Sequence, residues 1–394
     1  MHCIWVKDGT TRDACHWEFM VMTDKNTEPA RWRIDFWNRG NRQRPDRAWN
    51  LEVKRILFVT DAWEPQVNGV VQTLKSLFAA LAAIDIEVAH LTPAGHRTLP
   101  LPSYPDIRLA LTTRRRIAQR LEEIRPDHVH IVTEGPLGIH ARRVCLARGL
   151  PFTTSYHTRF PEYLRARVPV PETWSYRWLR AFHNSGSGTM VATPSLKREL
   201  EAHGFERLML WGRGVDTEGF HPRLRGDLGV GPPVFLYVGR VAVEKNLPAF
   251  LDLDLPGTKV VVGEGPDLAI LKSRYPGVVF AGTKRDEELA RHFASADVFV
   301  FPSRTDTFGL VLLEALASGT PVAAYPVTGP ADIFADGRGG VLSEDLGMAA
   351  LKALDIPREA AREKALEYGW DACARTFMDN VQKAQHDFAA RQAA

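Results

Sequence analysis

The chain has 394 residues, of which 45% are hydrophobic and 25% charged, as in ordinary globular proteins. This length exceeds one ordinary core and suits two domains. No apolar run reaches the roughly 18 residues that span a bilayer, and the first residues lack the apolar segment of a signal peptide. Four cysteines without a CxxC pair argue against a disulfide framework or a zinc site. We therefore expect a cytoplasmic protein that could contact the inner face of the membrane peripherally.

The net charge of +3 is spread unevenly along the chain. Residues 1–50 carry +2, residues 51–225 carry +7 and residues 226–394 carry −6. A basic half joined to an acidic half indicates two domains with different surroundings. The basic half could face an anionic membrane surface, and we expect no nucleic-acid partner.

Residues 1–50 differ from the rest of the chain. They contain five of the ten tryptophans and no sustained hydrophobic period of 2 or 3.6. We interpret them as a disordered extension, or as a stretch translated ahead of the real start. Contact of their Trp and Arg side chains with a membrane is an open alternative.

Strand and helix patterns alternate from residue 51 to residue 216. The expected strands span residues 55–60, 86–92, 107–111, 128–133, 152–157 and 189–195. The expected helices span residues 70–84, 114–124, 138–149 and 195–204. Such alternation gives a parallel sheet with helices on both faces, so residues 51–216 form the expected N-terminal, acceptor-side domain.

A polar stretch with Gly and Pro, residues 217–233, reads as a linker, after which the alternation restarts. The expected strands span residues 234–239, 259–263, 278–282, 297–303 and 321–326. The expected helices span residues 267–275, 286–296, 308–319 and 358–392. We assign residues 234–375 to a second doubly wound domain and residues 376–394 to a C-terminal helix. Two Rossmann-like α/β domains of this kind face a central cleft, outside the carboxyl ends of their strands.

Arg240 and Lys245 follow the strand over residues 234–239 and so lie at its carboxyl end. A planar guanidinium fork and a point charge placed there can neutralise a diphosphate. The alternative is a surface loop with ordinary ion pairs.

Asp306 and Glu314 lie eight residues apart, after the strand over residues 297–303. Phe308 and Gly309 open the helix that carries Glu314, and free N–H groups at a helix start favour a phosphate. A carboxylate within the apolar run LVLLEALA is unfavourable unless it is paired or bound, so Glu314 could hold a sugar diol. An exposed face of an amphipathic helix is the weaker alternative.

Three further positions follow predicted strands. Gly263 lies in a tight turn of the kind that lets a ligand approach the backbone. His157 is either a structural hydrogen-bonding residue or a residue facing the cleft. Gly69 begins a helix and offers a second candidate anion site, although the GxGxxG dinucleotide motif is missing.

At these places the chain resembles the retaining glycosyltransferases of family 4, which have the GT-B architecture, from about Lys54 to the C-terminal helix. The family carries two glutamates separated by seven residues, and here the first is Asp306. The strings VTDAWEPQVNGVV and YHTRFPEYL are similar to a branch of GDP-mannose-dependent alpha-mannosyltransferases and diacylglycerol glycosyltransferases. The shorter side chain of Asp306 leaves open which hydroxyl of the donor sugar it meets.

The resemblance implies a role for each candidate residue of the second domain. Arg240 and Lys245 would bind the donor diphosphate, and Glu314 would bind the ribose. Asp306, with the backbone from Thr307 to Gly309, would hold the donor sugar and phosphate.

The remaining roles implied by the resemblance concern the edges of the donor. Gly69 would lie beside the phosphate, and His157 would touch the donor sugar near the reaction centre. Thr283 and Lys284 would border the base.

The resemblance implies transfer of a hexose from a nucleoside diphosphate sugar, GDP-mannose or a UDP-sugar, to an acceptor hydroxyl. The implied reaction retains configuration by front-face attack. The acceptor is expected to be a membrane lipid such as diacylglycerol, or a glycan, since the segment over residues 159–183 and Arg114–Arg116 could lie on an anionic membrane. We expect no cofactor and no required metal. The Asp-x-Asp at 252–254 lies in a helix-forming stretch rather than after a strand.

Two other functions remain open at this point. A nucleotide-sugar epimerase could use the same two domains, and it would convert the nucleotide sugar without an acceptor. A non-catalytic protein could keep the fold to bind nucleotide sugar, although Arg240, Lys245 and Glu314 argue against this.

Overall fold

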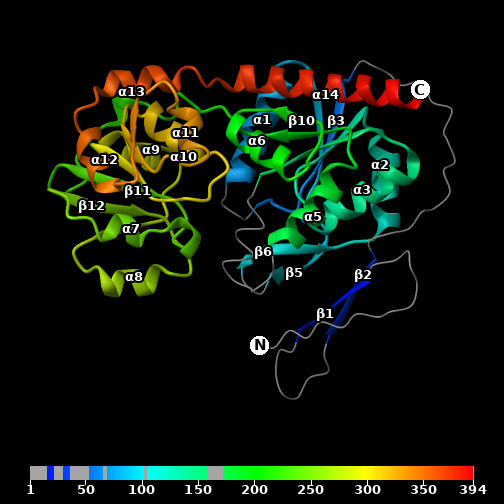
Figure 1. Ribbon diagram of the computed structural model, residues 1–394, viewed down its shortest axis with the longest axis horizontal. Coiled ribbons are helices and arrows are strands. Elements are labelled where there is room, and N and C mark those ends of the chain that lie inside the picture. The colour runs from blue at the N-terminus through cyan, green and yellow to red at the C-terminus, as the bar shows by residue number, and fades with distance from the viewer. Residues whose placement is uncertain are drawn as a thin grey trace. The chain divides into compact units, whose positions relative to one another are not determined.

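The computed structural model describes residues 16–21, 30–35, 53–64, 69–101, 104–157 and 172–393, and it divides into two compact units (Figure 1). The smaller unit contains an antiparallel pair, β1 (His16–Val21) and β2 (Ala30–Asp35), in which His16 lies opposite Asp35. We expected a disordered extension over residues 1–50. Of these 50 residues, the structure describes only the strands β1 and β2. The other residues of this range lie outside the described part of the chain, so the prediction is not tested there.

In the larger unit, six described parallel strands form a sheet in the order β10-β9-β8-β7-β3-β4. Its strands are β3 (Arg55–Val59), β4 (Glu87–Leu91), β7 (His128–Ile131), β8 (Phe152–Ser155), β9 (Gly188–Val191) and β10 (Leu208–Leu210). The helices between them are α1 (Gly69–Ala82), α2 (Arg114–Ile124), α3 (Pro136–Arg148), α5 (Glu172–His183) and α6 (Pro194–Ala202). This sheet confirms the first predicted doubly wound half.

The two faces of this sheet have separate apolar cores. Phe58 of β3 packs in one core with Leu74 of α1, whereas its neighbour Leu57 packs in the other with Leu121 of α2 and Val144 of α3. Successive strand residues point to opposite faces, and both faces are covered. The strands are therefore short and mostly buried on both faces, although β7 and β8 also bury His, Thr and Ser side chains.

One predicted strand of this half lies elsewhere. Residues 107–111 belong to β6 (Tyr104–Leu111), which pairs antiparallel with β5 (Arg97–Leu101) in a separate two-stranded sheet. Residues 107–111 were expected among the parallel strands, and β5 was not predicted. Pro100 lies within β5, and a proline weakens a strand pattern because it has no N–H to donate.

A second sheet of six described parallel strands follows, in the order β13-β12-β11-β14-β15-β16. Its strands are β11 (Val234–Val238), β12 (Thr258–Val262), β13 (Val279–Gly282), β14 (Val298–Phe301), β15 (Val322–Ala324) and β16 (Gly340–Leu342). The helices are α7 (Pro248–Leu251), α8 (Leu268–Arg274), α9 (Asp286–Ser295), α10 (Leu310–Ala317), α11 (Pro330–Ile333), α12 (Leu346–Ala353) and α13 (Arg358–Ala365). This order is that of the Rossmann fold, in which the strand order reverses between the first and fourth strands, here β11 and β14. The two-domain α/β prediction is therefore confirmed.

The helix predicted over residues 358–392 is broken in two. α13 ends at Ala365, and α14 (Trp370–Ala393), red in Figure 1, begins after Gly369. Phe377 of α14 stacks on Phe58 of β3 with ring centroids 5.4 Å apart. The C-terminal helix therefore packs in the core of the first sheet, although it follows the second sheet in the chain.

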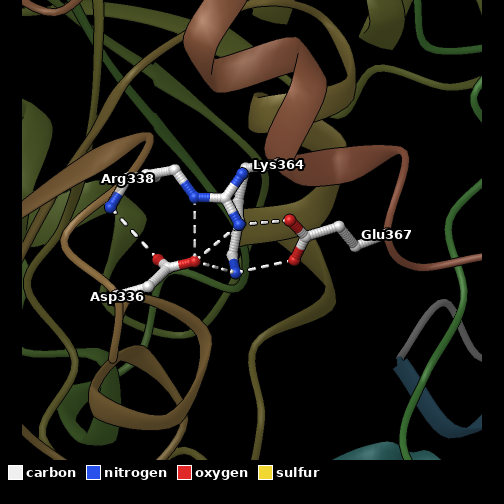
Figure 2. A network of polar contacts seen from close by, with 4 residues as sticks. All are labelled: Asp336, Arg338, Lys364 and Glu367. Carbon is white, nitrogen blue, oxygen red and sulfur yellow. Dashed lines mark hydrogen bonds and ion pairs between the residues drawn. The ribbon is translucent and has the colours of Figure 1, made fainter.

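Charged side chains join α13 to the turn before β16 (Figure 2). Lys364 of α13 is 6% exposed, and its Nζ lies 2.9 Å from Asp336 and 2.8 Å from Glu367. Arg338 contacts the same two carboxylates from the solvent side.

In the described part of the chain, no helix is both long enough and apolar enough to cross a membrane.

Candidate functional site

Two of the predicted site residues, Lys245 and Asp306, form an ion pair between two loops at the edge of the second sheet. Lys245 ends the short 3₁₀ turn η2 (Val243–Lys245) after β11, and Asp306 follows β14, the strand beside β11. Lys245 Nζ donates to both carboxylate oxygens of Asp306, at 2.8 Å each. A cation and an acid from neighbouring strand ends thus meet at the carboxyl edge of the sheet.

Backbone and side-chain contacts fix these two loops beside each other. Thr305 Oγ1 donates to the carbonyl oxygen of Glu244 at 3.3 Å, and Asn246 Nδ2 donates to that of Pro302 at 3.1 Å. Arg240 is half-buried at the end of β11, where its carbonyl oxygen accepts a hydrogen bond of 2.9 Å from the Tyr237 hydroxyl.

Gly263 serves close packing between two loops. A Cβ added there would lie 2.0 Å from the carbonyl oxygen of Gly239, and its φ of +135° is rarely adopted by other residues. The space on the side where a Cβ would point is filled by the loop after β11. The expected approach of a ligand to the backbone of this turn stays a prediction.

Glu314 lies on α10, whose N-terminal cap is Gly309 with a φ of +86°. Its carboxylate is partly buried and accepts no hydrogen bond from any residue that the structure describes. Burial raises the pKa of this carboxyl from its ordinary 4.5 to about 7. Phe308, by contrast, is buried in the core beside Tyr368, so only its backbone remains available for binding.

His157 follows β8 of the first sheet and contacts Thr307, which lies in the loop after β14 of the second sheet. Its carbonyl oxygen accepts a hydrogen bond of 2.8 Å from Thr307 Oγ1. Its ring Nδ1 lies 3.1 Å from Arg213 Nη2, while its Nε2 is buried without a partner among the described residues. Burial, with Arg213 nearby, holds the pKa of His157 well below its ordinary value.

The remaining predicted positions are Gly69, Thr283 and Lys284. Gly69 begins α1, and a Cβ added there would lie 3.6 Å from the Leu310 side chain, at the start of α10. Residues 65–68 of the same loop lie outside the described residues. Thr283 is exposed after β13, and Lys284 is ion-paired with Glu288 on the next helix. Lys245, Asp306, Thr307 and His157 are therefore linked by direct contacts, whereas Thr283 is not among them.

Two buried charged residues beside these positions were not predicted from the sequence. Arg213 is 7% exposed and contacts His157. Asp61, after β3, accepts hydrogen bonds from the backbone N–H groups of Leu137 and Gly138 at the start of α3. Burial raises the pKa of Asp61 to about 6. Asp61 follows a strand that the sequence predicts, but β10, which precedes Arg213, was not predicted, and the sequence shows the burial of neither residue.

The Asp-x-Asp at 252–254 lies after α7 rather than after a strand, as expected. The Tyr275 hydroxyl donates to Asp252 Oδ1 at 2.6 Å. Across the described ranges, no group of three or more His, Cys, Asp or Glu residues is arranged to hold a metal ion.

Comparison with known proteins identifies the family. The family model described as Glycosyltransferase Family 4 matches residues 67–219, and Glycosyl transferases group 1 matches residues 232–355. The chain is 32% identical over 357 residues to a GDP-mannose-dependent alpha-mannosyltransferase of Mycolicibacterium smegmatis, a match that covers 80% of this chain and 94% of that protein. The chain belongs to glycosyltransferase family 4. It is therefore a glycosyltransferase of the GT-B type that acts on nucleotide sugars.

Other family members extend this comparison. The sulfoquinovosyl transferase SQD2 of Arabidopsis thaliana is 34% identical over 322 residues, which are 73% of this chain and 62% of that protein. Among solved structures, that of Anabaena HepE with UDP and glucose has a TM-score of 0.63 and 16% identity, covering 83% of this chain and 99% of HepE. At that identity, the likeness supports the GT-B fold alone.

Proposed function

We propose that this family 4 glycosyltransferase is a retaining hexosyltransferase. It moves a sugar from GDP-mannose or a UDP-sugar to a hydroxyl of a membrane lipid, such as diacylglycerol or a glycolipid. The observation that carries the proposal is the Lys245–Asp306 pair, because it sets a phosphate-binding cation beside a sugar-binding acid where nucleotides bind in such sheets.

Each residue of the donor site has a chemical task in this proposal. Lys245 and Arg240 neutralise the diphosphate, whose charge increases as the sugar departs, and the N-terminus of α10 adds N–H groups. Glu314 accepts hydrogen bonds from the two ribose hydroxyls. In the free protein Asp306 supplies the counter-charge to Lys245, and the incoming diphosphate then competes for that lysine.

The reaction exchanges one glycosidic bond for another. The bond from the anomeric carbon to the diphosphate oxygen breaks, and a bond to the acceptor oxygen forms on the same face of the sugar. The proton of the acceptor hydroxyl passes to the leaving phosphate. We propose this front-face course from the family resemblance, and we expect it to proceed without added metal.

A lipid acceptor is favoured by the surface of the first half and by the relatives. α2 carries exposed arginines at 114, 115, 116 and 120, and Trp174 of α5 is 54% exposed to solvent. Basic and aromatic side chains suit an anionic bilayer surface. An alpha-monoglucosyldiacylglycerol synthase of Streptococcus pneumoniae is 26% identical over 383 residues, covering 85% of each chain. The protein would then act as a peripheral enzyme at the membrane.

A donor and acceptor screen tests the proposal. GDP-mannose and UDP-glucose are each supplied with diacylglycerol in anionic vesicles or with a soluble glycan, with and without EDTA. We expect transfer to lipid that survives EDTA, and an α-linked product by proton NMR. Conversion of the donor without any acceptor would indicate an epimerase instead. Strict manganese dependence or a β-linked product would contradict the metal-free or retaining part of the proposal.

A further inference from the structure

Arg213 is a buried cation in the segment that follows β10. Its side chain is fixed by the chain around it, since Nη1 donates to the carbonyl oxygens of Trp211 and Gly212 at 2.8 Å each. The guanidinium carbon lies 4.3 Å from the centroid of the Trp211 ring. Burial lowers the pKa of Arg213 to about 10, so the group remains charged at neutral pH. These contacts hold Nη1 and leave Nη2 directed elsewhere.

Arg213 Nη2 lies 3.1 Å from Nδ1 of His157. A guanidinium carries donors only, so in this contact Nδ1 must be the acceptor. A neutral imidazole with a lone pair on Nδ1 carries its proton on Nε2. The position of Arg213 therefore selects one of the two histidine tautomers.

The surroundings of the ring keep it neutral. The His157 and Trp211 rings are packed edge-to-face, with centroids 6.1 Å apart. Besides burial, three titratable groups act on the pKa of His157, and all three lower it: Arg213, His130 and His183. None of these carries a negative charge that could stabilise an imidazolium. Nε2–H is buried and has no hydrogen-bond partner among the described residues. A buried donor without a partner is unfavourable, so this N–H suits an acceptor that arrives with a ligand.

We propose that Arg213 is a positioning residue for sugar transfer, which fixes His157 as an Nε2–H donor to an oxygen of the transferred sugar. This inference rests on the proposed function, in which His157 meets the donor sugar. It also excludes a role for His157 as a base through Nε2, because that nitrogen already carries its proton. Thr307 holds the backbone of the same residue, so both the place and the tautomer of the ring are set.

The first experiment measures the tautomer of His157 in the wild-type protein and uses one variant only to assign its signals. The full-length protein labelled with ¹⁵N-histidine gives two-bond ¹H–¹⁵N spectra, and the spectrum of His157→Gln identifies the His157 signals. We expect a neutral Nε2–H tautomer throughout pH 6–8, whether or not any transfer has been found. An Nδ1–H tautomer, or a charged ring at pH 7, would overturn the inference while leaving the proposed function intact.

The second experiment removes the cation and its donor. Arg213→Met is compared with Arg142→Met, a matched control whose guanidinium bonds to Ser185 and the Ala181 carbonyl instead. We expect Arg213→Met to mix the tautomers and to lower kcat by about 10-fold, the effect of one lost hydrogen bond, with KM little changed. The control should retain both. Arg213→Lys, which keeps a donor, should recover part of the tautomer preference and serves where Arg213→Met does not fold.

A double variant separates positioning from mere structural support. If Arg213 acts through His157, then Arg213→Met added to His157→Gln causes no further fall in kcat. A multiplicative further loss would overturn the inference. If the wild-type protein transferred no sugar from any donor, the proposed function would be contradicted instead, and the tautomer measurement would still test the role of Arg213.

Discussion

Lys245 Nζ lies 2.8 Å from both carboxylate oxygens of Asp306, which is 61 residues away in the chain. Both side chains remain about one-fifth exposed, at 20% and 17%. The pair is therefore neither a fully buried structural bridge nor a screened surface contact. It leaves the lysine accessible from the edge of the sheet, as a diphosphate ligand requires.

Lys245→Met should lower sugar transfer by about 100-fold or more, because a cation that stabilises the leaving diphosphate acts mainly in the transition state. The fold should survive, and kcat/KM measured by release of the nucleoside diphosphate reports the loss. Lys383→Met is the matched control, since Lys383 is also paired with an aspartate, Asp387, but lies on α14. Turnover of Lys245→Met close to that of Lys383→Met would contradict the donor-site assignment.

Glu314 should make the stability of the free protein depend on pH. Its pKa in the folded chain is about 7, against an ordinary 4.5, so between these values the folded protein binds more protons than the unfolded one. The free energy of unfolding then falls as pH rises from about 4.5 to 7 and stays lower above that. Glu314→Gln removes this loss and should stabilise the protein at pH 8 by at most about 3 kcal/mol.

Urea denaturation at pH 8 and pH 4.5 measures this difference, which should nearly vanish at the lower pH. Glu363→Gln, on the exposed face of α13, should change neither value. Equal stabilisation by Glu314→Gln at both pH values would contradict a titrating carboxylate.

The same substitution should weaken binding of the nucleoside diphosphate at least about 10-fold by calorimetry, since a charged hydrogen-bond acceptor for the ribose is lost.

The fold was largely predictable because its strands are short apolar runs separated by helices with a clear period. β11 and β14 read VFLYV and VFVF, and both faces of their sheet are covered, so no polar residue interrupts them. β16 (Gly340–Leu342) was missed because its three residues contain a glycine and follow a glycine-rich turn. The last helical pattern was wrongly predicted as one helix, because α13 ends before Gly369 and the second part, α14, packs on the other sheet.

The candidate site was predictable only where a residue follows a strand. Asp306 and Lys245 could be placed at one sheet edge, since adjacent parallel strands end together. Their ion pair could not be foreseen, because it depends on loop geometry. Arg213 gave no signal, since burial of an arginine depends on the tryptophan and carbonyl groups that surround it. The close contact of Gly263 with the Gly239 backbone could not be foreseen either, because it depends on how the loops after β11 and β12 pack.

Gly263→Ala should therefore destabilise the second half even without any ligand. The added Cβ would lie 2.0 Å from the carbonyl oxygen of Gly239, and the φ of +135° is strained for alanine, so a loss of about 2 kcal/mol or more is expected. Gly277→Ala is the matched control, because a Cβ there meets nothing within 4 Å. Thermal unfolding compares the two. An unchanged melting temperature for Gly263→Ala would show that the loops after β11 and β12 can separate freely.

The Lys364 network should affect stability and leave chemistry alone (Figure 2). The Lys364 ammonium, with Arg338, holds the pKa of Asp336 well below its ordinary value, so this pair stabilises the fold above the unfolded pKa of an aspartate. That stability is lost as the pH falls through the lower folded value. Lys364→Met should reduce the free energy of unfolding by about 1–2 kcal/mol at pH 7, because the lysine is buried but both acids are partly exposed.

The same variant tests whether the network is independent of the donor site. At 20 °C, where the fold remains intact, kcat and KM for sugar transfer should match those of the wild-type protein. Arg338→Met is the matched surface change, and it should cost less stability, because Arg338 is half exposed and Lys364 remains to neutralise both acids. A fall in kcat without a fall in melting temperature for Lys364→Met would mean that α13 communicates with α10, which packs beside it and carries Glu314.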